Sequence, residues 1–187
     1  MAAGDLTSLP NVKGWMSPPL TNATDDELLK RLITAASQYI QTWLNRTIAS
    51  TLYVETYNGT GGNRLILPNY PVTAVGSVAV NFTPIPAAPA SSGSSGFLFD
   101  SFGLYLRGFS FTEGFQNVAV TYTAGFLTTP PELEQACIEL VALRYKERDR
   151  VGQNSKSIGG EIVSFNTKDF TGPIQTILDS YKKVITF

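Results

Sequence analysis

The sequence predicts an α+β fold in which two long amphipathic helices flank a region of short strands. Apolar residues recur at three- and four-residue steps after Thr24 and again after Pro131, which indicates a helix in each segment. Apolar and polar residues alternate from Val118 to Thr123, which indicates a strand with one buried face. Between the two helical segments, short runs rich in Val, Tyr and Thr are separated by Gly, Pro and Asn, which indicates a sheet.

The strand and helix over residues 118–150 form the clearest pattern. The larger apolar residues of the strand fall on one face: Val118, Val120 and Tyr122. Gly125 ends the strand where the backbone must turn, and Thr129-Pro-Pro-Glu132 has the spacing of a capping box. The helix that follows has a length of about 20 residues. The turn carries neither Gly-x-Ser-x-Gly nor Gly-Lys-Ser/Thr, which excludes a nucleophile elbow and a phosphate-binding loop.

The N-terminal part is predicted to be an arm followed by the first long helix. Residues 1–23 are punctuated by Pro and Gly, and Trp15, Met16 and Leu20 are candidate anchors of this arm on the body. Thr24-Asp-Asp-Glu27 has the spacing of a second capping box. The helix after it carries one continuous apolar stripe: Leu28, Leu29, Leu32, Ile33, Ala36, Tyr39, Ile40, Trp43 and Leu44.

Further strands are predicted between the helices, at residues 51–57, 64–67, 72–82, 97–99 and 104–107. Asn58-Gly-Thr-Gly-Gly62 is predicted to be a hairpin tip, because neither a helix start nor a lysine follows where a phosphate loop needs one. Residues 84–96 are rich in Pro, Ala, Ser and Gly and lack apolar periodicity, so they are predicted to form a flexible, exposed loop.

The C-terminal part is predicted to be a second arm. Residues 158–165 follow a polar stretch and alternate as a strand does, so they are expected to pair with a sheet edge of this molecule or of a neighbour. Pro173 begins a short helix with one apolar side: Ile174, Ile177, Leu178, Tyr181 and Val184. This helix either docks on a partner or packs on its own core. The chain is thus predicted to be a single domain, with arms at 1–23 and 151–187 and a body at 24–150.

Charge is sparse and unevenly distributed. The chain has 187 residues, of which 43% are hydrophobic and 16% are charged, below the roughly 25% that soluble domains average. No Asp, Glu, Lys or Arg lies between Leu65 and Phe99 or between Gly114 and Pro131. Since no apolar run has the length of a membrane span, we expect other protein chains to cover much of this neutral surface. The alternative is a Ser/Thr/Asn-rich surface that is soluble by itself.

The composition argues against several kinds of chemistry. The chain has no histidine, which excludes histidine-based triads and most zinc sites. Its net charge of −1 does not indicate a nucleic-acid-binding protein. The N-terminus lacks the pattern of a signal peptide and there is one cysteine, so we expect synthesis in a cytoplasm. Cys137 lies on an apolar stripe and is predicted to be buried, and the carboxylates of the second helix do not converge. No enzyme activity, metal or cofactor is expected.

Two arginines continue the apolar stripe of the second long helix. Arg144 and Arg148 are four residues apart, on the line of Leu133, Cys137 and Leu140. A mixed-charge helix end is usually solvated. Because arginine makes forked bonds to carboxylates, we predict that these two side chains lie at a subunit boundary.

The order of these segments resembles the head–tail connector (adaptor) proteins of tailed bacteriophages, the gp6-like connector family. The resemblance covers about Thr24 to Lys183. It is carried by five stretches: Trp43-Leu-Asn-Arg46, Leu65-Ile-Leu-Pro-Asn-Tyr-Pro-Val72 with the run to Val78, Val118-Ala-Val-Thr-Tyr-Thr-Ala-Gly-Phe126 with Pro130-Pro-Glu-Leu133, Ser157-Ile-Gly-Gly-Glu-Ile-Val-Ser-Phe165 and Leu178-Asp-Ser-Tyr181.

The resemblance implies a mainly α, helical body with a small antiparallel sheet or hairpin, assembled as a ring that is typically twelve-fold. Such a ring lies in the virion neck beneath the portal protein, meets a stopper or tail-completion protein on its other side, and lets double-stranded DNA pass non-specifically. The subunit-interface candidates are Arg144, Tyr145 and Arg148. The portal-docking candidates in the C-terminal segment are Ile158, Ile162, Val163, Phe165, Ile177, Leu178 and Tyr181.

Two other functions are compatible with the sequence. Another structural component of a phage tail or capsid would also assemble through neutral β-surfaces. A carbohydrate-binding module would suit the Tyr/Phe- and Ser/Thr-rich strands, but the two long helices and the lack of a signal peptide disfavour it.

Overall fold

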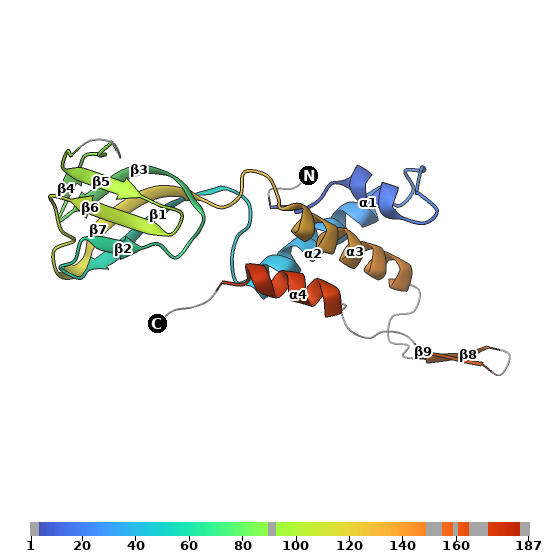
Figure 1. Ribbon diagram of the computed structural model, residues 1–187. Coiled ribbons are helices and arrows are strands. Elements are labelled where there is room, and N and C mark those ends of the chain that lie inside the picture. Colours follow the sequence, from blue (N-terminus) through green and yellow to red (C-terminus); the bar gives the residue numbers. More distant parts are fainter. Residues whose placement is uncertain (1–3, 90–92, 149–154, 159–160, 165–171, 184–187) are drawn as a thin grey trace. The chain divides into compact units, whose positions relative to one another are not determined.

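The computed structural model describes residues 4–89, 93–148, 155–158, 161–164 and 172–183. The chain divides into two compact units (Figure 1). The helical unit comprises Met1–Arg46 and Thr129–Phe187, and the β-unit comprises Thr47–Thr128. The α+β class is therefore confirmed, but the strands build a compact unit of their own rather than a small hairpin beside a helical body. The assignment of the whole chain to a single functional domain stays a prediction.

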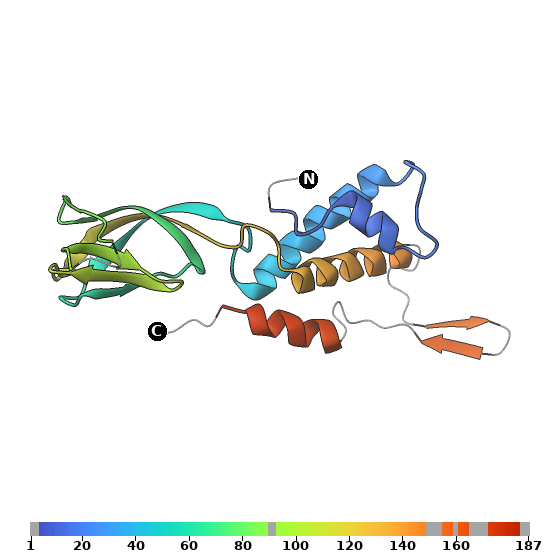
Figure 2. The ribbon, with the colours of Figure 1, turned by 45° about the horizontal axis from the view of Figure 1, so that its top comes forward.

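Within its described residues, the helical unit contains four helices: α1 (Leu9–Trp15), α2 (Asp26–Leu44), α3 (Pro131–Glu147) and α4 (Gly172–Tyr181). Helices α2 and α3 pack side by side, and α4 lies along them (Figure 2). α2 and α3 are antiparallel, because Tyr145 near the end of α3 bonds to Asp25 at the start of α2. The predicted stripe of α2 is buried at its central positions: Leu29, Ile33, Ala36, Ile40 and Leu44. Helix α3 buries the facing side chains, including Leu133, Cys137 and Leu140.

The N-terminal segment contains a helix that the sequence did not predict. Ser8 caps α1 by accepting a hydrogen bond from the Asn11 amide. Val12 is fully buried and Met16 is 4% exposed, so these two residues anchor the segment. Trp15, a predicted anchor, is 53% exposed.

Neither predicted capping box forms. Helix α2 begins one residue after Asp25 and α3 one residue after Pro130, and neither cap residue makes a side-chain hydrogen bond to its own helix. The physical reason differs between the two helices. The observed N-cap positions, Asp25 and Pro130, lie one residue after the predicted caps Thr24 and Thr129. The Asp25 carboxylate instead binds Tyr145 and Arg148, and Pro130 has no side-chain acceptor to offer. The predicted proline in the first turn of α3 is confirmed.

The β-unit is built from two antiparallel sheets that share one core (Figure 1). Its strands are β1 (Thr51–Gly59), β2 (Arg64–Ile66), β3 (Val72–Val80), β4 (Thr83–Ile85), β5 (Gly96–Phe99), β6 (Gly103–Arg107) and β7 (Gly114–Ala124). The strand orders are β1-β7-β3-β4 and β2-β6-β5. The predicted inner face of β7 is confirmed, because Val118, Val120 and Tyr122 are all at most 1% exposed.

Two local predictions in the β-unit are wrong. The Gly-rich stretch after β1 is not a hairpin tip, because β1 pairs with β7 whereas β2 pairs with β6 in the other sheet. The start of the predicted loop at 84–96 is anchored rather than free. Ile85 and Ala88 are buried, and the amide of Ala88 donates to the Phe97 carbonyl at 2.9 Å. Residues 90–92 of that loop lie outside the described residues.

A short hairpin follows α3 in the chain. Strands β8 (Ser155–Ile158) and β9 (Glu161–Ser164) pair antiparallel, with Ser155 opposite Ser164. The predicted strand character of residues 161–164 is confirmed, and its partner is the preceding local strand. Phe165 and Val184 lie outside the described residues.

Candidate assembly surfaces

Five side chains join the end of α3 to α2 and its N-cap residue. The Tyr145 hydroxyl donates a hydrogen bond to Oδ2 of Asp25. The Arg148 Nη1 atom lies 3.7 Å from the same oxygen, and its guanidinium lies 4.1 Å from the centroid of the Tyr145 ring. One helical turn earlier, the Arg144 guanidinium lies 5.0 Å from the centroid of the Tyr39 ring on α2.

Arg148 thus meets a carboxylate within its own chain. The side chains of Arg148 and Asp25 are 40% and 30% exposed, so water reaches the pair and the pair contributes at most about 1 kcal/mol to stability. The assignment of Arg144, Tyr145 and Arg148 to a subunit interface stays a prediction.

Helix α4 contributes to the core of the helical unit. Leu178 is fully buried and Ile174 is 7% exposed, so α4 packs on its own chain, which is one of the two alternatives that the sequence left open. The Tyr181 hydroxyl donates to Oε2 of Glu132 on α3 at 3.0 Å. Desolvation and this hydrogen bond raise the pKa of Tyr181. Among the predicted docking residues of α4, Ile177 and Tyr181 are partly accessible and Leu178 is not.

An open groove of about 420 Å³ lies between α3 and α4. Its walls combine apolar and polar side chains: Pro131, Glu132, Gln135, Ala136, Glu139, Ile174 and Ile177. This groove is the accessible surface next to the predicted docking residue Ile177. Of the other docking candidates, Ile158, Ile162 and Val163 lie in β8 and β9, and Phe165 is outside the described residues.

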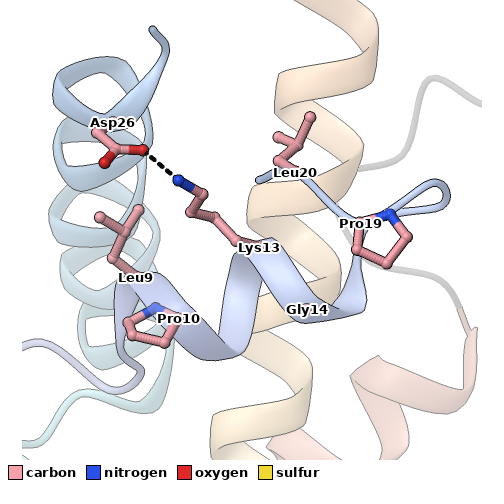
Figure 3. Close-up of a pocket in the computed structure, with 7 residues that line it drawn as sticks. All are labelled: Leu9, Pro10, Lys13, Gly14, Pro19, Leu20 and Asp26. Atoms are coloured by element: carbon pink, nitrogen blue, oxygen red, sulfur yellow. Dashed lines mark hydrogen bonds and ion pairs between the residues drawn. The ribbon is translucent and has the colours of Figure 1, made fainter. Parts of the chain in front are cut away.

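A second open pocket, of about 430 Å³, lies beside α1 and the start of α2 (Figure 3). It is lined by Leu9, Pro10, Lys13, Gly14, Pro19, Leu20 and Asp26. The Lys13 ammonium binds Oδ1 of Asp26 at 2.7 Å (Figure 3). It also donates to the carbonyl oxygen of Asn22 at 2.5 Å. Because the carboxylate balances the lysine charge, we assign these contacts to the anchoring of α1 on α2 rather than to anion binding.

A half-buried polar cluster lies in the β-unit. The hydroxyls of Tyr57 and Tyr122 both donate to Oε2 of Glu55, the latter at 2.6 Å. The Asn69 amide donates to the Tyr122 oxygen at 3.0 Å, and the Tyr53 ring stacks on the Tyr122 ring with centroids 5.4 Å apart. Burial, followed by the hydrogen bond to Glu55, raises the pKa of both phenols, that of Tyr122 to about 12. Neither tyrosine is therefore a ready nucleophile, and the cluster fixes the Glu55 carboxylate inside the β-unit.

Alkaline pH is expected to destabilise the β-unit. The pKa of Tyr122 rises from an ordinary 10.0 to about 12 in the folded protein, so the folded state holds the proton more tightly than the unfolded chain. This contribution to stability is complete below pH 10 and is lost as the pH rises through about 12. We expect the melting temperature to fall over this range, and to fall less steeply in Tyr122→Phe, as measured by calorimetry. Parallel curves for the two proteins would contradict this role.

Strand β1 is an edge of the four-stranded sheet, and its outward face is apolar. Leu52 is 64% exposed and Val54 is 75% exposed. They lie opposite Thr123 and Thr121 of β7 in the register of the sheet. The outer face formed by β1, β7 and β3 carries no charged side chain: Leu52, Val54, Thr56, Ala119, Thr121, Thr123, Ala74 and Ser77. Part of the uncharged surface expected from the sequence is thus the outer face of β1, β7 and β3.

Sequence reasoning missed the exposure of β1. The alternation of Leu52 and Val54 with Tyr53, Glu55 and Tyr57 was visible. On hydrophobicity alone either face could have been the inner one. The signal that selects the tyrosine face is the cross-strand stacking of Tyr53 on Tyr122, which depends on the register with β7.

The described residues contain no arrangement that suggests catalysis or metal binding. Cys137 is fully buried as predicted, and burial raises the pKa of its thiol to about 11, so the thiolate is not available at neutral pH. No group of three or more Cys, Asp or Glu side chains in the described part of the chain could hold a metal ion. Among the described helices, none has the length and apolar character needed to cross a membrane.

Solved structures of particle necks share this fold. A chain in the neck of an empty gene transfer agent particle, computed with C6 symmetry, is 16% identical with a TM-score of 0.59, covering 100% of this chain and 94% of that chain. For the neck of the native particle, computed with C12 symmetry, the identity is 15% and the TM-score 0.52, over 86% of this chain and 84% of that chain. A chain of the native gene transfer agent virion is 15% identical with a TM-score of 0.51, over 89% and 82% of the two chains.

Fold and sequence together define the class of protein as a head–tail connector of the phage type, which confirms the resemblance. No curated protein matches the chain in sequence. The chain belongs to the head completion protein family, whose model matches residues 5–184.

Proposed function

We propose that this chain is a structural protein of the virion neck, where copies of it form a ring-shaped head–tail adaptor. The observation that carries the proposal is family membership over residues 5–184, and the fold shared with chains of particle necks supports it. In this role, one side of the ring contacts the portal protein and the other a stopper or tail-completion protein. Double-stranded DNA passes through the channel. The protein is made in the host cytoplasm and uses no cofactor.

A cyclic assembly is consistent with the surface of the β-unit. The two neck structures with this fold were computed with C6 and C12 symmetry, which supports a ring of twelve copies here. An uncharged outer sheet face can be covered by a neighbouring copy without burying unpaired charge. The net charge of −1 suits a channel through which DNA slides without being held.

The end of α3 is proposed as one subunit boundary. Arg148→Ala is expected to weaken ring assembly while lowering the free energy of unfolding of the monomer by less than about 1 kcal/mol, because the Asp25 pair is exposed to water. Sedimentation velocity over a dilution series measures the first effect and urea denaturation the second. Lys146→Ala, an exposed change on the same helix, is the matched control. Assembly that is equal in both variants would remove Arg148 from the interface.

The accessible part of α4 is proposed as the portal contact. Ile177 lines the groove between α3 and α4 and is partly exposed, so a glutamate there should abolish apolar docking without emptying the core. Co-expression with the portal protein of the same virus should yield a complex for the wild type and none for Ile177→Glu. Leu127→Glu, at a side chain that is 93% exposed in the β-unit, should leave the complex intact. Failure of the wild-type chain to bind the portal protein would contradict the adaptor role.

A further inference from the structure

Strand β1 lacks the usual protection of an exposed sheet edge. It has nine residues, Thr51–Gly59, and within the described residues it pairs with β7 alone. Natural edge strands are shielded by lysine, proline, bulges or brevity, because their unpaired N–H and C=O groups bind other strands. β1 contains neither Lys nor Pro, and its irregularity lies at its very end, between Tyr57 and Gly59. Its single charged residue, Glu55, is bound by Tyr57 and Tyr122 inside the unit and does not guard the edge.

The ligand that fits such an edge is another extended backbone. Strand β1 pairs with β7 along one side, so the peptide groups that face the other side belong to alternate residues of the nine-residue strand. An added strand satisfies these groups, because it supplies alternating donors and acceptors at the same spacing. The exposed Leu52 and Val54 side chains would gain apolar contacts on the outer face. No lysine or arginine lies in β1, so a phosphate-bearing partner has no cation to bind there.

The same chain carries a two-stranded hairpin that belongs to neither of the two larger sheets. Strands β8 and β9 form a two-stranded hairpin, and within the described residues no third strand joins them. An isolated two-stranded hairpin is marginally stable in water, and a third strand stabilises it. The other edges are poorer partners. β4 has three residues with Pro84 at its centre, β2 has three residues, and β5 is already bridged by Ala87.

In a cyclic ring of more than two copies, the two surface patches that meet at each subunit contact must be different patches of the chain. Repeated pairing of β1 with β1 is isologous and closes a dimer, whereas a cyclic ring needs a heterologous contact in which one patch binds a different patch of the next copy. Pairing of a hairpin strand with β1 meets that requirement. Resting on the ring proposed above, we infer that the β8–β9 hairpin of one copy adds to the β1 edge of the next copy and extends its four-stranded sheet.

The inference is tested by blocking each half of the contact in the full-length chain. Leu52→Lys with Val54→Lys places two ammonium groups on the edge strand, and a second variant replaces residues 155–164 by a Gly/Ser linker of equal length. Each should raise the concentration for half-assembly roughly tenfold or more. Ile66→Lys is the matched control, because Ile66 is 62% exposed on another edge strand, and it should assemble like the wild type. Circular dichroism of the monomers checks that each variant is folded.

Mixing the two blocked variants gives the sharper result. One retains an intact hairpin and the other an intact β1, so a heterologous contact predicts heterodimers in the mixture but not in either variant alone. Hydrogen exchange should show new protection of β1 amides in the wild-type ring and in these heterodimers. The inference would be overturned if the variant with the replaced hairpin still formed rings. It would also be overturned if that variant lost portal binding while its ring formation stayed unchanged. Both results would leave the adaptor role standing. A wild-type chain that forms no ring would instead contradict the proposed function itself.

Discussion

Gly125→Ala is expected to destabilise the β-unit by about 3 kcal/mol or more, because it combines backbone strain with a steric clash. Gly125 has a φ of +113°, which L side chains rarely adopt. A Cβ atom there would lie 2.5 Å from the Ala49 carbonyl oxygen, and this neighbour is backbone that cannot rotate away. The turn also closes the unit, since the Gly125 amide donates to the Pro71 carbonyl at 2.9 Å. Relief of the clash would therefore disturb a bond between two strand ends.

The measurement is hydrogen exchange of the β1 and β7 amides, which reports the opening of this unit separately from the helices. Gly14→Ala is the matched control. Gly14 lies in α1 with nothing within 4 Å of an added Cβ, so the same substitution is expected to leave stability unchanged or to raise it by about 0.5–1 kcal/mol. A Gly125→Ala protein as stable as the wild type would show that the turn adopts another conformation.

In the full-length chain without the portal protein, Leu178→Ala is expected to lower the free energy of unfolding of the helical unit by about 2–5 kcal/mol. This is the usual range for replacing a fully buried leucine by alanine. Leu178 is fully buried in α4, which packs against α2 and α3. Both tryptophans, Trp15 and Trp43, belong to the helical unit, so their fluorescence in a urea titration follows this unit alone.

Ile177→Ala separates core packing from docking. Its side chain is only partly buried, so the loss should stay below about 1.5 kcal/mol. If Leu178 instead contacted the portal protein, Leu178→Ala would leave the stability of the chain alone unchanged and would weaken only its binding to the portal protein.

The helices and strands that were predicted correctly are those whose hydrophobic periodicity lies within one continuous stretch of sequence. The helix after Asp25 and the strand ending at Gly125 follow from their own periodicity, and the structure confirms both. Helix α1 was missed because seven residues with Val12 as the buried position show too few turns for a periodic stripe. Ser8 followed by Pro10 was the available signal, since it combines an N-cap with a first-turn proline.

The candidate surfaces could be predicted only in part, because they depend on contacts between distant segments. The carboxylate that binds Arg148 comes from Asp25, and nothing near Arg148 in the sequence identifies it. Leu178 and Ile177 are adjacent on one short helix, and only the packing on α3 distinguishes the buried one from the accessible one. The Gly-rich stretch after β1 was recognisable as a turn, but local composition does not say that the next strand joins a different sheet.

The central claim is that copies of this chain close into a ring, and the mass and symmetry of the purified assembly test it most directly. Sedimentation velocity with electron microscopy of the isolated protein, and of its mixture with the portal protein, is expected to show a closed ring of about twelve copies. A chain that stays monomeric in both samples would contradict the account.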